Sequence, residues 1–125
     1  MFSHVMIGTN DLEKAKAFYD ALLGTLEIPP ARVDRHRIFY RTKTGVFSVS
    51  KPIDGKPATH ANGGTIGFTC NSPGQADAWH AAGIANGGTT CEEPPGVREG
   101  AAGKIYLAYL RDLDGNKICA LHRIE

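Results

Sequence analysis

The stretch that decides the fold is His4–Gly24, HVMIGTNDLEKAKAFYDALLG, because it joins a strand pattern to a helix pattern. Its first residues alternate, with Val5 and Ile7 on one side of the predicted strand and His4 and Met6 on the other. Its later apolar residues recur at helical spacing and are Leu12, Ala15, Phe18, Tyr19 and Leu22. The stretch therefore predicts a short strand followed by an amphipathic helix.

Both ends of this predicted helix carry sequence signals. Asn10 is the expected N-cap, because its side-chain oxygen can accept a hydrogen bond from an N–H of the first turn. Glu13 follows three residues later, at the spacing of a capping box. Gly24 is expected to end the helix, since glycine readily adopts the backbone conformation found just past a helix.

A second stretch, Thr65–Ala85, repeats the order of strand, cap and helix as TIGFTCNSPGQADAWHAAGIA. Ser72 is the expected N-cap, Pro73 suits the first helical position, and Gln75 stands three residues after the cap. The two stretches align without a gap at a shift of about 61 residues. The agreement of strand, cap and inner helix face favours a duplicated unit, although few residues are identical.

Each predicted helix is followed by strand-like material, so each half of the chain predicts the order β-α-β-β-β. The turn DLDGN at 112–116 lies between two apolar runs and is a strong hairpin signal. The stretch PPGVREGAAGK at 94–104 is rich in Gly and Pro, and we expect a loop there, either a plain surface loop or a lid over a cavity. The strands expected after the helices are Val33–Arg41, Gly45–Lys51, 89–94, Ile105–Asp112 and Lys117–Ile124.

The composition indicates one globular domain. Of the 125 residues, 42% are apolar, which is enough for a core, and the net charge is +1. The basic cluster at 32–37 is short and interrupted, so nucleic-acid binding is not expected. Three cysteines without a CxxC spacing indicate neither a disulfide framework nor a structural zinc site. With no secretory signal pattern and no long apolar run, we expect no membrane association and a cytoplasmic location.

Two motifs together resemble a known family. The opening HVMIGTNDLEKAKAFYDALLG and the later YLRDLDGNKICALH are similar to the two ends of the vicinal oxygen chelate superfamily. That superfamily includes glyoxalase I, extradiol dioxygenases, fosfomycin-resistance transferases and bleomycin-resistance proteins. In its usual Asp-Pro-Asp-Gly-Asn hairpin, Leu113 here replaces the proline.

The resemblance implies an α+β fold in which two βαβββ modules form a curved mixed sheet around a cavity. The whole chain, 1–125, would be a single domain of this kind. Module one would span about 1–52, a linker about 53–63, and module two about 64–125. The resemblance also implies a homodimer, because the half-sheets of this family often pair across chains.

In metal-dependent members, the resemblance implies ligands from the first and last strand of each module. His4 matches the first slot, whereas Thr65 occupies the corresponding slot of module two, and a threonine hydroxyl is a poor ligand for a first-row divalent ion. The usual glutamate of the last strand falls on Cys119, and the last strand of module one offers only FSVSK. We therefore expect no metal cofactor. A divalent metal at His4, helped by Cys119 or by His60 of the linker, is the alternative.

Strand alternation and the family motif give the expected ligand-binding residues. They are His4, Met6, Thr65, Thr69, Tyr109, Cys119 and, from the loop at 94–104, Arg98. Such a weakly polar lining suits a small, partly apolar organic molecule. We expect a metal-free binding protein similar in kind to bleomycin-resistance proteins. A metal-dependent lyase, dioxygenase or transferase of the same superfamily stays open, as does a scaffold with a filled core, so the sequence does not decide whether the protein is an enzyme.

Overall fold

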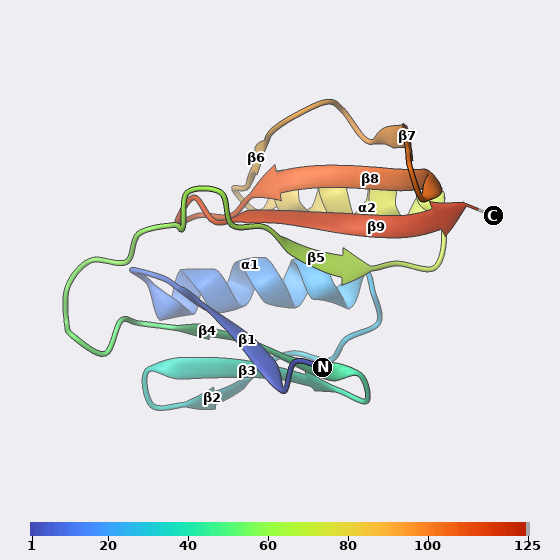
Figure 1. Ribbon diagram of the computed structural model, residues 1–125. Coiled ribbons are helices and arrows are strands. Elements are labelled where there is room, and N and C mark those ends of the chain that lie inside the picture. The colour runs from blue at the N-terminus through green and yellow to red at the C-terminus, as the bar shows by residue number, and fades with distance from the viewer. Residues whose placement is uncertain (125) are drawn as a thin grey trace.

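A computed structural model describes residues 1–124 of the chain. Each half of the chain has the same order of elements, a strand, a helix and then further strands (Figure 1). The elements are β1 (His4–Gly8), α1 (Leu12–Gly24), β2 (Arg32–Asp34), β3 (Arg37–Thr42), β4 (Gly45–Ser50), β5 (Ile66–Thr69), α2 (Pro73–Ala85), β6 (Thr89–Thr90), β7 (Gly96–Gly100), β8 (Gly103–Arg111) and β9 (Lys117–Ile124).

The strands form two mixed sheets, one in each half of the chain. Module one holds the order β1-β4-β3-β2, and module two holds β5-β9-β8-β6, with β7 paired to β8. In each module the first strand runs parallel to the last, β1 to β4 and β5 to β9, and the other pairs are antiparallel. The predicted α+β class with a duplicated module is therefore confirmed.

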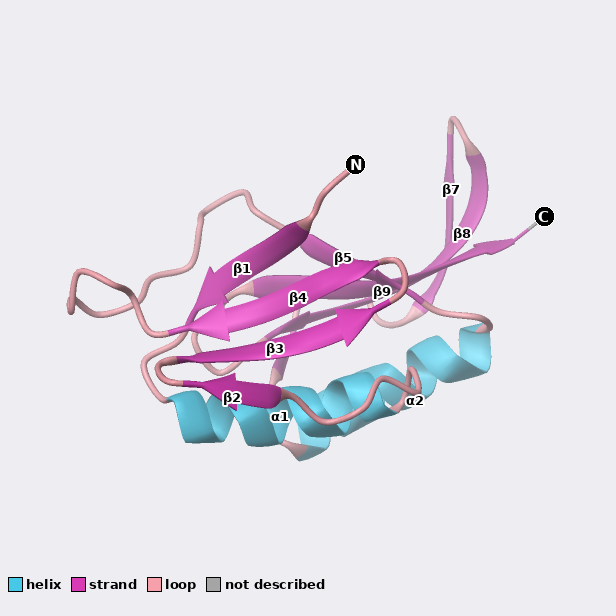
Figure 2. Cartoon of the chain, turned by 90° about the horizontal axis from the view of Figure 1, so that it is seen from below, coloured by secondary structure: helices cyan, strands magenta, loops and turns pink. Residues whose placement is uncertain are grey.

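Both helices lie on the same side of the two sheets, and the opposite strand faces are uncovered (Figure 2). One apolar core fills the space between helices and sheets, and α1 packs against α2. Its largest fully buried side chains include Trp79, Tyr19, Tyr40, Phe18 and Leu22. The two modules therefore share one core, because the two helices pack together as a single layer against both sheets.

The contact between the helices depends on a glycine. A Cβ atom at Gly83 would lie 2.2 Å from the Cδ1 atom of Leu110 and 3.1 Å from the Cδ1 atom of Leu22. No side chain larger than hydrogen fits there without displacing its neighbours. Leu22 and Gly83 are related by the same shift that aligns the two halves. Module one therefore supplies a leucine at this position, and module two supplies a glycine that makes room for it.

The two helix caps differ from each other in how well the sequence predicts them. Ser72 caps α2 as expected, since its hydroxyl accepts from the N–H of Gln75 at 3.1 Å. The predicted cap of α1 is wrong, because Asp11 rather than Asn10 accepts from the Lys14 N–H, at 3.0 Å.

The Asn10 side chain is occupied by the linker instead. Its amide oxygen accepts from the Ala58 N–H at 2.6 Å, and its amide nitrogen donates to the Ala58 carbonyl oxygen at 3.3 Å. This pair of hydrogen bonds holds the linker against the end of β1. A contact 48 positions away in the chain has therefore replaced the local cap.

Two strand predictions are also corrected. The expected single strand Val33–Arg41 is interrupted by a turn in which Arg35 has a φ of 59°, so that β2 folds back on β3. The expected loop at 94–104 is a β-hairpin, since β7 pairs antiparallel with β8. This hairpin projects away from the rest of the fold (Figure 2).

Hydrogen bonds tie the two modules together at the turn before β9. The Tyr19 hydroxyl on α1 donates to the Asp112 carboxylate at 2.5 Å, and the Asn116 side chain donates to the Gly8 carbonyl at 3.1 Å. Asp112 also accepts from the backbone N–H of Asn116 at 2.9 Å, which fixes the turn itself. Among residues 1–124, no helix is long and apolar enough to cross a membrane.

Candidate functional site

The faces of the two sheets that lie away from the helices form the open side of the molecule, here called the open face. Register partners in a sheet point to the same side, so the pairings identify which side chains share this face. In module one, Val5 and its partner Phe47 lie on the helix side, and His4 and Met6 therefore lie on the open face.

The central row of the open face in module one is filled. It consists of Met6, Ser48 and Phe39, which are register partners across β1, β4 and β3. Ser48 has no exposed surface, and its hydroxyl has no hydrogen-bond partner among the described residues. The guanidinium carbon of Arg41 lies 5.0 Å from the centre of the Phe39 ring. Met6 thus stands beside a serine that is already sealed from solvent.

The corresponding row of module two lacks one side chain. Its members are Gly67, Cys119 and Tyr109, on β5, β9 and β8. Gly67 aligns with Met6 at the shift that relates the two halves. A Cβ atom at Gly67 would lie 3.3 Å from the Cys119 sulfur, a tight contact, and would approach no other neighbouring side chain closely. The row of module two therefore lacks the side chain that Met6 supplies in module one, and the Cys119 sulfur borders the remaining space on one side.

A charged cluster lies next to this row, formed by Lys117, Glu92, Tyr109 and Cys119 and called here the Lys117 cluster. The Lys117 ammonium lies 4.9 Å from the centre of the Tyr109 ring and pairs with the Glu92 carboxylate. Glu92 has a φ of 56°, a left-handed backbone conformation that costs energy for a residue with a Cβ atom. The hydrogen bond that Lys117 donates to the Glu92 carboxylate raises the pKa of Lys117, so the amine is a stable cation at neutral pH.

The thiol of the cluster is protonated at neutral pH. Burial raises the pKa of Cys119 to about 11, and the positive charge of Lys117 only partly opposes this. Burial also raises the pKa of the Tyr109 hydroxyl. Neither group is activated as a nucleophile, because the reactive thiolate and phenolate forms are disfavoured there.

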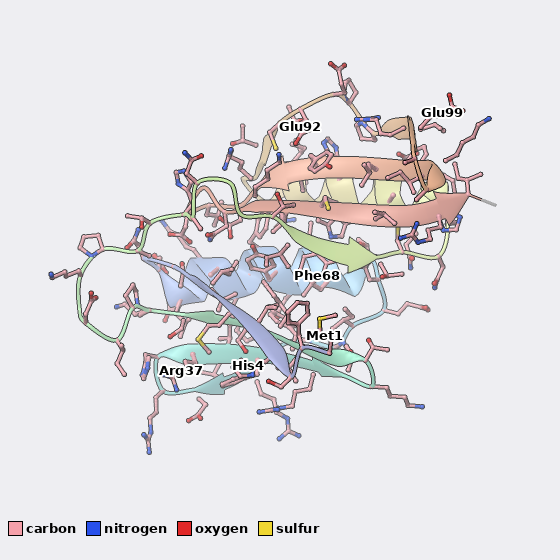
Figure 3. The ribbon with its side chains drawn as sticks, viewed as in Figure 1. Met1, His4, Arg37, Phe68, Glu92 and Glu99 are labelled. Atoms are coloured by element: carbon pink, nitrogen blue, oxygen red, sulfur yellow. The ribbon has the colours of Figure 1, made fainter. Side chains whose placement is uncertain are left out.

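A cleft of about 520 Å³ lies between the two modules, at the end of β1 where His4 stands. In Figure 3, Met1 and Phe68 lie between the two sheets and His4 lies beside them on module one, whereas Glu92 lies beyond β8 at the far edge of module two. The cleft has apolar walls from both modules and polar side chains at its edge. The apolar members are Val5, Leu23, Leu26, Ile28, Phe47, Ile66 and Phe68, and the polar edge includes His4, Thr42, Thr44 and Thr69.

The predicted ligand-binding residues fall into separate places. His4 and Thr69 line the cleft, together with Gly67. Tyr109 and Cys119 are register partners on the open face of module two. Two others lie apart: Met6 is on the open face of module one, and Thr65 precedes β5 outside any strand.

Arg98 has a role that the sequence did not predict. It lies on β7, and its guanidinium donates to the carbonyl oxygens of Glu93 at 3.1 Å and Pro94 at 2.9 Å. These bonds brace the stretch that leads from Glu92 into the hairpin. Its register partner Ile105 places Arg98 on the same open face as Tyr109.

The residues at the family's metal positions do not fit a metal ion. His4 is the one imidazole among them, and its Nδ1 atom lies 2.8 Å from the Ser3 hydroxyl. Within residues 1–124, no three His, Cys, Asp or Glu side chains are close enough to share an ion.

His60 does not complete a site with His4. Its ring lies against Gly115, since a Cβ atom there would come 3.2 Å from the His60 Nδ1 atom. The turn that contains Gly115 is bonded to Gly8, at the opposite end of β1 from His4. The placement of His60 therefore does not fit the alternative in which it helps His4 to hold a metal ion.

Glu92 and the Lys117–Tyr109 contact are the features that sequence reasoning missed. Strand alternation places Lys117 on the same face as Cys119, so that part was open to prediction. Glu92 lies outside the strands, and nothing in the local sequence indicates that its side chain returns to β9.

Comparisons with known proteins agree with this architecture. Residues 1–120 match the family model of the Glyoxalase/Bleomycin resistance protein/Dioxygenase superfamily. A crystal structure of a glyoxalase/bleomycin resistance protein from Albidiferax ferrireducens T118 is 69% identical, with a TM-score of 0.97 over 98% of this chain and 99% of that chain.

More distant structures share the fold. The crystal structure of lactoylglutathione lyase from Agrobacterium tumefaciens is 20% identical, with a TM-score of 0.66 over 98% of this chain and 92% of that chain. A glyoxalase-related enzyme from Fulvimarina pelagi is 17% identical, with a TM-score of 0.75 over 98% of this chain and 88% of that chain. With its two modules and its match over nearly the whole length, the chain belongs to the Glyoxalase/Bleomycin resistance protein/Dioxygenase superfamily.

Proposed function

We propose that this protein binds a small, partly apolar organic molecule in the cleft between its modules, without a resident metal ion. The observation that carries the proposal is the cleft itself, which measures about 520 Å³ and has apolar walls with His4 and Thr69 at its edge. Ligand sites in proteins are typically concave, largely apolar and furnished with a few polar groups that orient the ligand.

The donor chemistry supports binding rather than metal-assisted catalysis. His4 carries the one imidazole at the family's metal positions, and none of these positions holds a carboxylate. A catalytic metal ion generally takes three protein ligands, and within residues 1–124 no three His, Cys, Asp or Glu side chains come together. The relative from Albidiferax ferrireducens, described as a glyoxalase/bleomycin resistance protein, is compatible with either role.

A thermal-shift screen tests the proposal. Untagged protein dialysed against EDTA should be heated with a panel of small aromatic and anionic compounds, because a compound that binds only the folded state raises the melting temperature. We expect at least one class of compound to raise it in the presence of EDTA. A rise that appears only with added zinc, nickel or manganese, and that His4→Ala abolishes, would contradict the proposal in favour of a metal-dependent enzyme.

We also propose that the protein is a cytoplasmic homodimer. β1 pairs only with β4 and β5 only with β9, so within residues 1–124 each has one edge without a neighbouring strand. Exposed strand edges are generally covered or paired in native assemblies. Sedimentation equilibrium should give twice the mass of the chain, and a monomer at high micromolar concentration would contradict this.

A further inference from the structure

We propose that the Lys117 cluster is the anchor for a carboxylate, so that the ligand of this protein is a small monocarboxylate with an apolar body. In the bound state, Lys117 exchanges the Glu92 carboxylate for the carboxylate of the ligand. The apolar body then lies in the space beside Gly67 and continues into the cleft. This inference rests on the proposed function and adds the chemical class of the ligand.

The first argument is the charge of the open face of module two. Lys117, Arg98 and Arg111 lie on this face, as their register partners show. Arg98 donates to two backbone carbonyls, and Arg111 donates to the carbonyl of Gly115 at 2.8 Å. Glu92 is the carboxylate that pairs with Lys117. The face therefore carries more positive than negative charge. Arg98 and Arg111 are held by backbone carbonyls, whereas Lys117 pairs with a side chain, Glu92, that a ligand can displace.

The second argument is that the existing ion pair is easily exchanged. Glu92 is exposed and lies between β6 and β7, outside the strands. An ion pair in contact with solvent contributes little net free energy, because both charges are also well hydrated when apart. A ligand carboxylate that brings its own apolar contacts therefore competes well against Glu92 for the same ammonium group.

The third argument is the space beside Gly67. Gly67 lines the cleft and is also the register partner of Cys119, so it adjoins the Lys117 cluster, whose own four residues lie outside the lining of the cleft. The surfaces around it are weakly polar, formed by the Cys119 thiol and the Tyr109 ring. A flat or slender apolar group can lie against them.

The experiment compares benzoate with benzamide by titration calorimetry. The two probes have nearly the same shape, but only benzoate carries a negative charge. We expect the wild-type protein to bind benzoate about tenfold more tightly than benzamide, the scale of one charge-assisted hydrogen bond. Lys117→Met should remove this preference, and Lys117→Arg should largely retain it.

Glu92→Gln should change the affinity for benzoate in the opposite direction to Lys117→Met. Removing the competing carboxylate should tighten benzoate binding about two- to fivefold, the range expected for release of an exposed ion pair. Benzamide binding should stay unchanged. The matched control is Lys104→Met, which removes a lysine of the same sheet whose ammonium lies 3.8 Å from Glu99. It should leave the affinity for both probes as in the wild type.

A double variant tests the space independently of charge. Gly67→Met together with Cys119→Ser copies the Met6–Ser48 pair of module one and fills the proposed site. Binding of benzoate should be lost while the circular dichroism spectrum and the cooperative melting transition are kept. If this variant does not fold, the Lys117 and Glu92 variants still decide the question.

The inference is overturned if the wild type does not prefer benzoate, or if Lys117→Met and Glu92→Gln leave the preference unchanged. In either case, neutral compounds that raise the melting temperature in EDTA would leave the proposed function standing. If no compound binds in that screen, the proposed function fails as well. A preference for benzoate that disappears with Lys117→Met supports both.

Discussion

The two modules share a framework and differ in what fills the centre of their open faces. In module one the central position of β1 is Met6, and the neighbouring Ser48 is sealed from solvent. In module two the equivalent position of β5 is Gly67, beside Cys119. One residue per module thus decides whether the row is closed or offers space. Duplication has preserved the strand register, and the difference in function is expected to lie in single positions along it.

The helix side of the sheets differs from the open faces, because there the side chains of the two modules pack against each other. Phe18 and Trp79 are related by the shift that aligns the two halves, and both are fully buried in one shared core. Leu22 fits against Gly83 at the junction of the helices. The two modules therefore form one core, whereas their open faces differ.

The largest expected effect comes from removing either large aromatic residue of the shared core. Phe18→Ala and Trp79→Ala should each lower the free energy of unfolding by about 3–5 kcal/mol, the cost of truncating a buried aromatic side chain. Urea denaturation followed by circular dichroism should show a single transition in both variants, at lower urea. Two separate transitions, one for each module, would show that the modules do not share a core.

A smaller effect is expected at the hydrogen bond that joins α1 to the turn before β9. Burial, followed by the charge and hydrogen bond of Asp112, raises the pKa of Tyr19 well above its usual value. Tyr19→Phe should lower the free energy of unfolding at pH 7 by about 1–2 kcal/mol, because the buried Asp112 carboxylate loses a donor.

The pH dependence of this variant has a defined sign. Because the folded-state pKa of Tyr19 is raised, its contribution is fully present below about pH 10, the ordinary tyrosine pKa, and is lost as the pH rises further. The stability difference between wild type and Tyr19→Phe should therefore shrink above that pH. A difference that grows at alkaline pH would contradict the assignment.

Asp20 of module one has no carboxylate counterpart in module two, where Ala81 aligns with it. Burial opposes ionisation of Asp20, but hydrogen bonds from Lys16, the Ala31 N–H and the Tyr40 hydroxyl lower its pKa overall. Asp20→Asn should cost about 1 kcal/mol at pH 7. Since the folded-state pKa is lowered, the difference should vanish as the pH falls below about 4.

The matched control for Asp20 is on the other helix. Asp77 of α2 also accepts from a tyrosine hydroxyl, that of Tyr106 at 2.6 Å, but it is exposed. Asp77→Asn should change the free energy of unfolding less than Asp20→Asn at pH 7. Equal effects would show that the extra donors around Asp20 contribute nothing.

The smallest change in stability, and the sharpest test of the comparison, is Met6→Gly. It copies Gly67 into module one and should cost about 0.5–1 kcal/mol, because glycine is unfavourable within a strand. The opened row would lie next to Arg41, so the stoichiometry of benzoate binding should rise from one to two per chain. A stoichiometry that stays at one would show that space alone does not distinguish the modules.

The sequence predicts the duplicated framework well, because hydrophobic periodicity and helix caps are local signals. Ser72 caps α2 as expected, and the fold class follows from the two repeated stretches. One error arises where a distant contact replaces a local one, because Asn10 bonds to Ala58 of the linker. The other has a local cause, because residues 96–100, expected in a loop, pair with the adjacent strand β8 in spite of their Gly content.

The candidate site is predicted only in part from the sequence. Alternation places Tyr109 and Cys119 on one face, but no local pattern brings Glu92 to Lys117 or gives Arg98 its backbone partners. The cleft also lies between the two modules, and the packing of α1 on α2 that joins them is not encoded in a linear pattern.

An amide-shift map from nitrogen–proton NMR, recorded during a benzoate titration, tests the central claim most directly. The account predicts saturable shifts at 65–69 and 117–121 of module two and at the cleft residues 4–5 and 46–47 of module one, with much smaller shifts at 6–8 and 48–50. Shifts at 6–8 and 48–50 as large as those at 117–121, or shifts confined to residues outside the cleft and the Lys117 cluster, would contradict it.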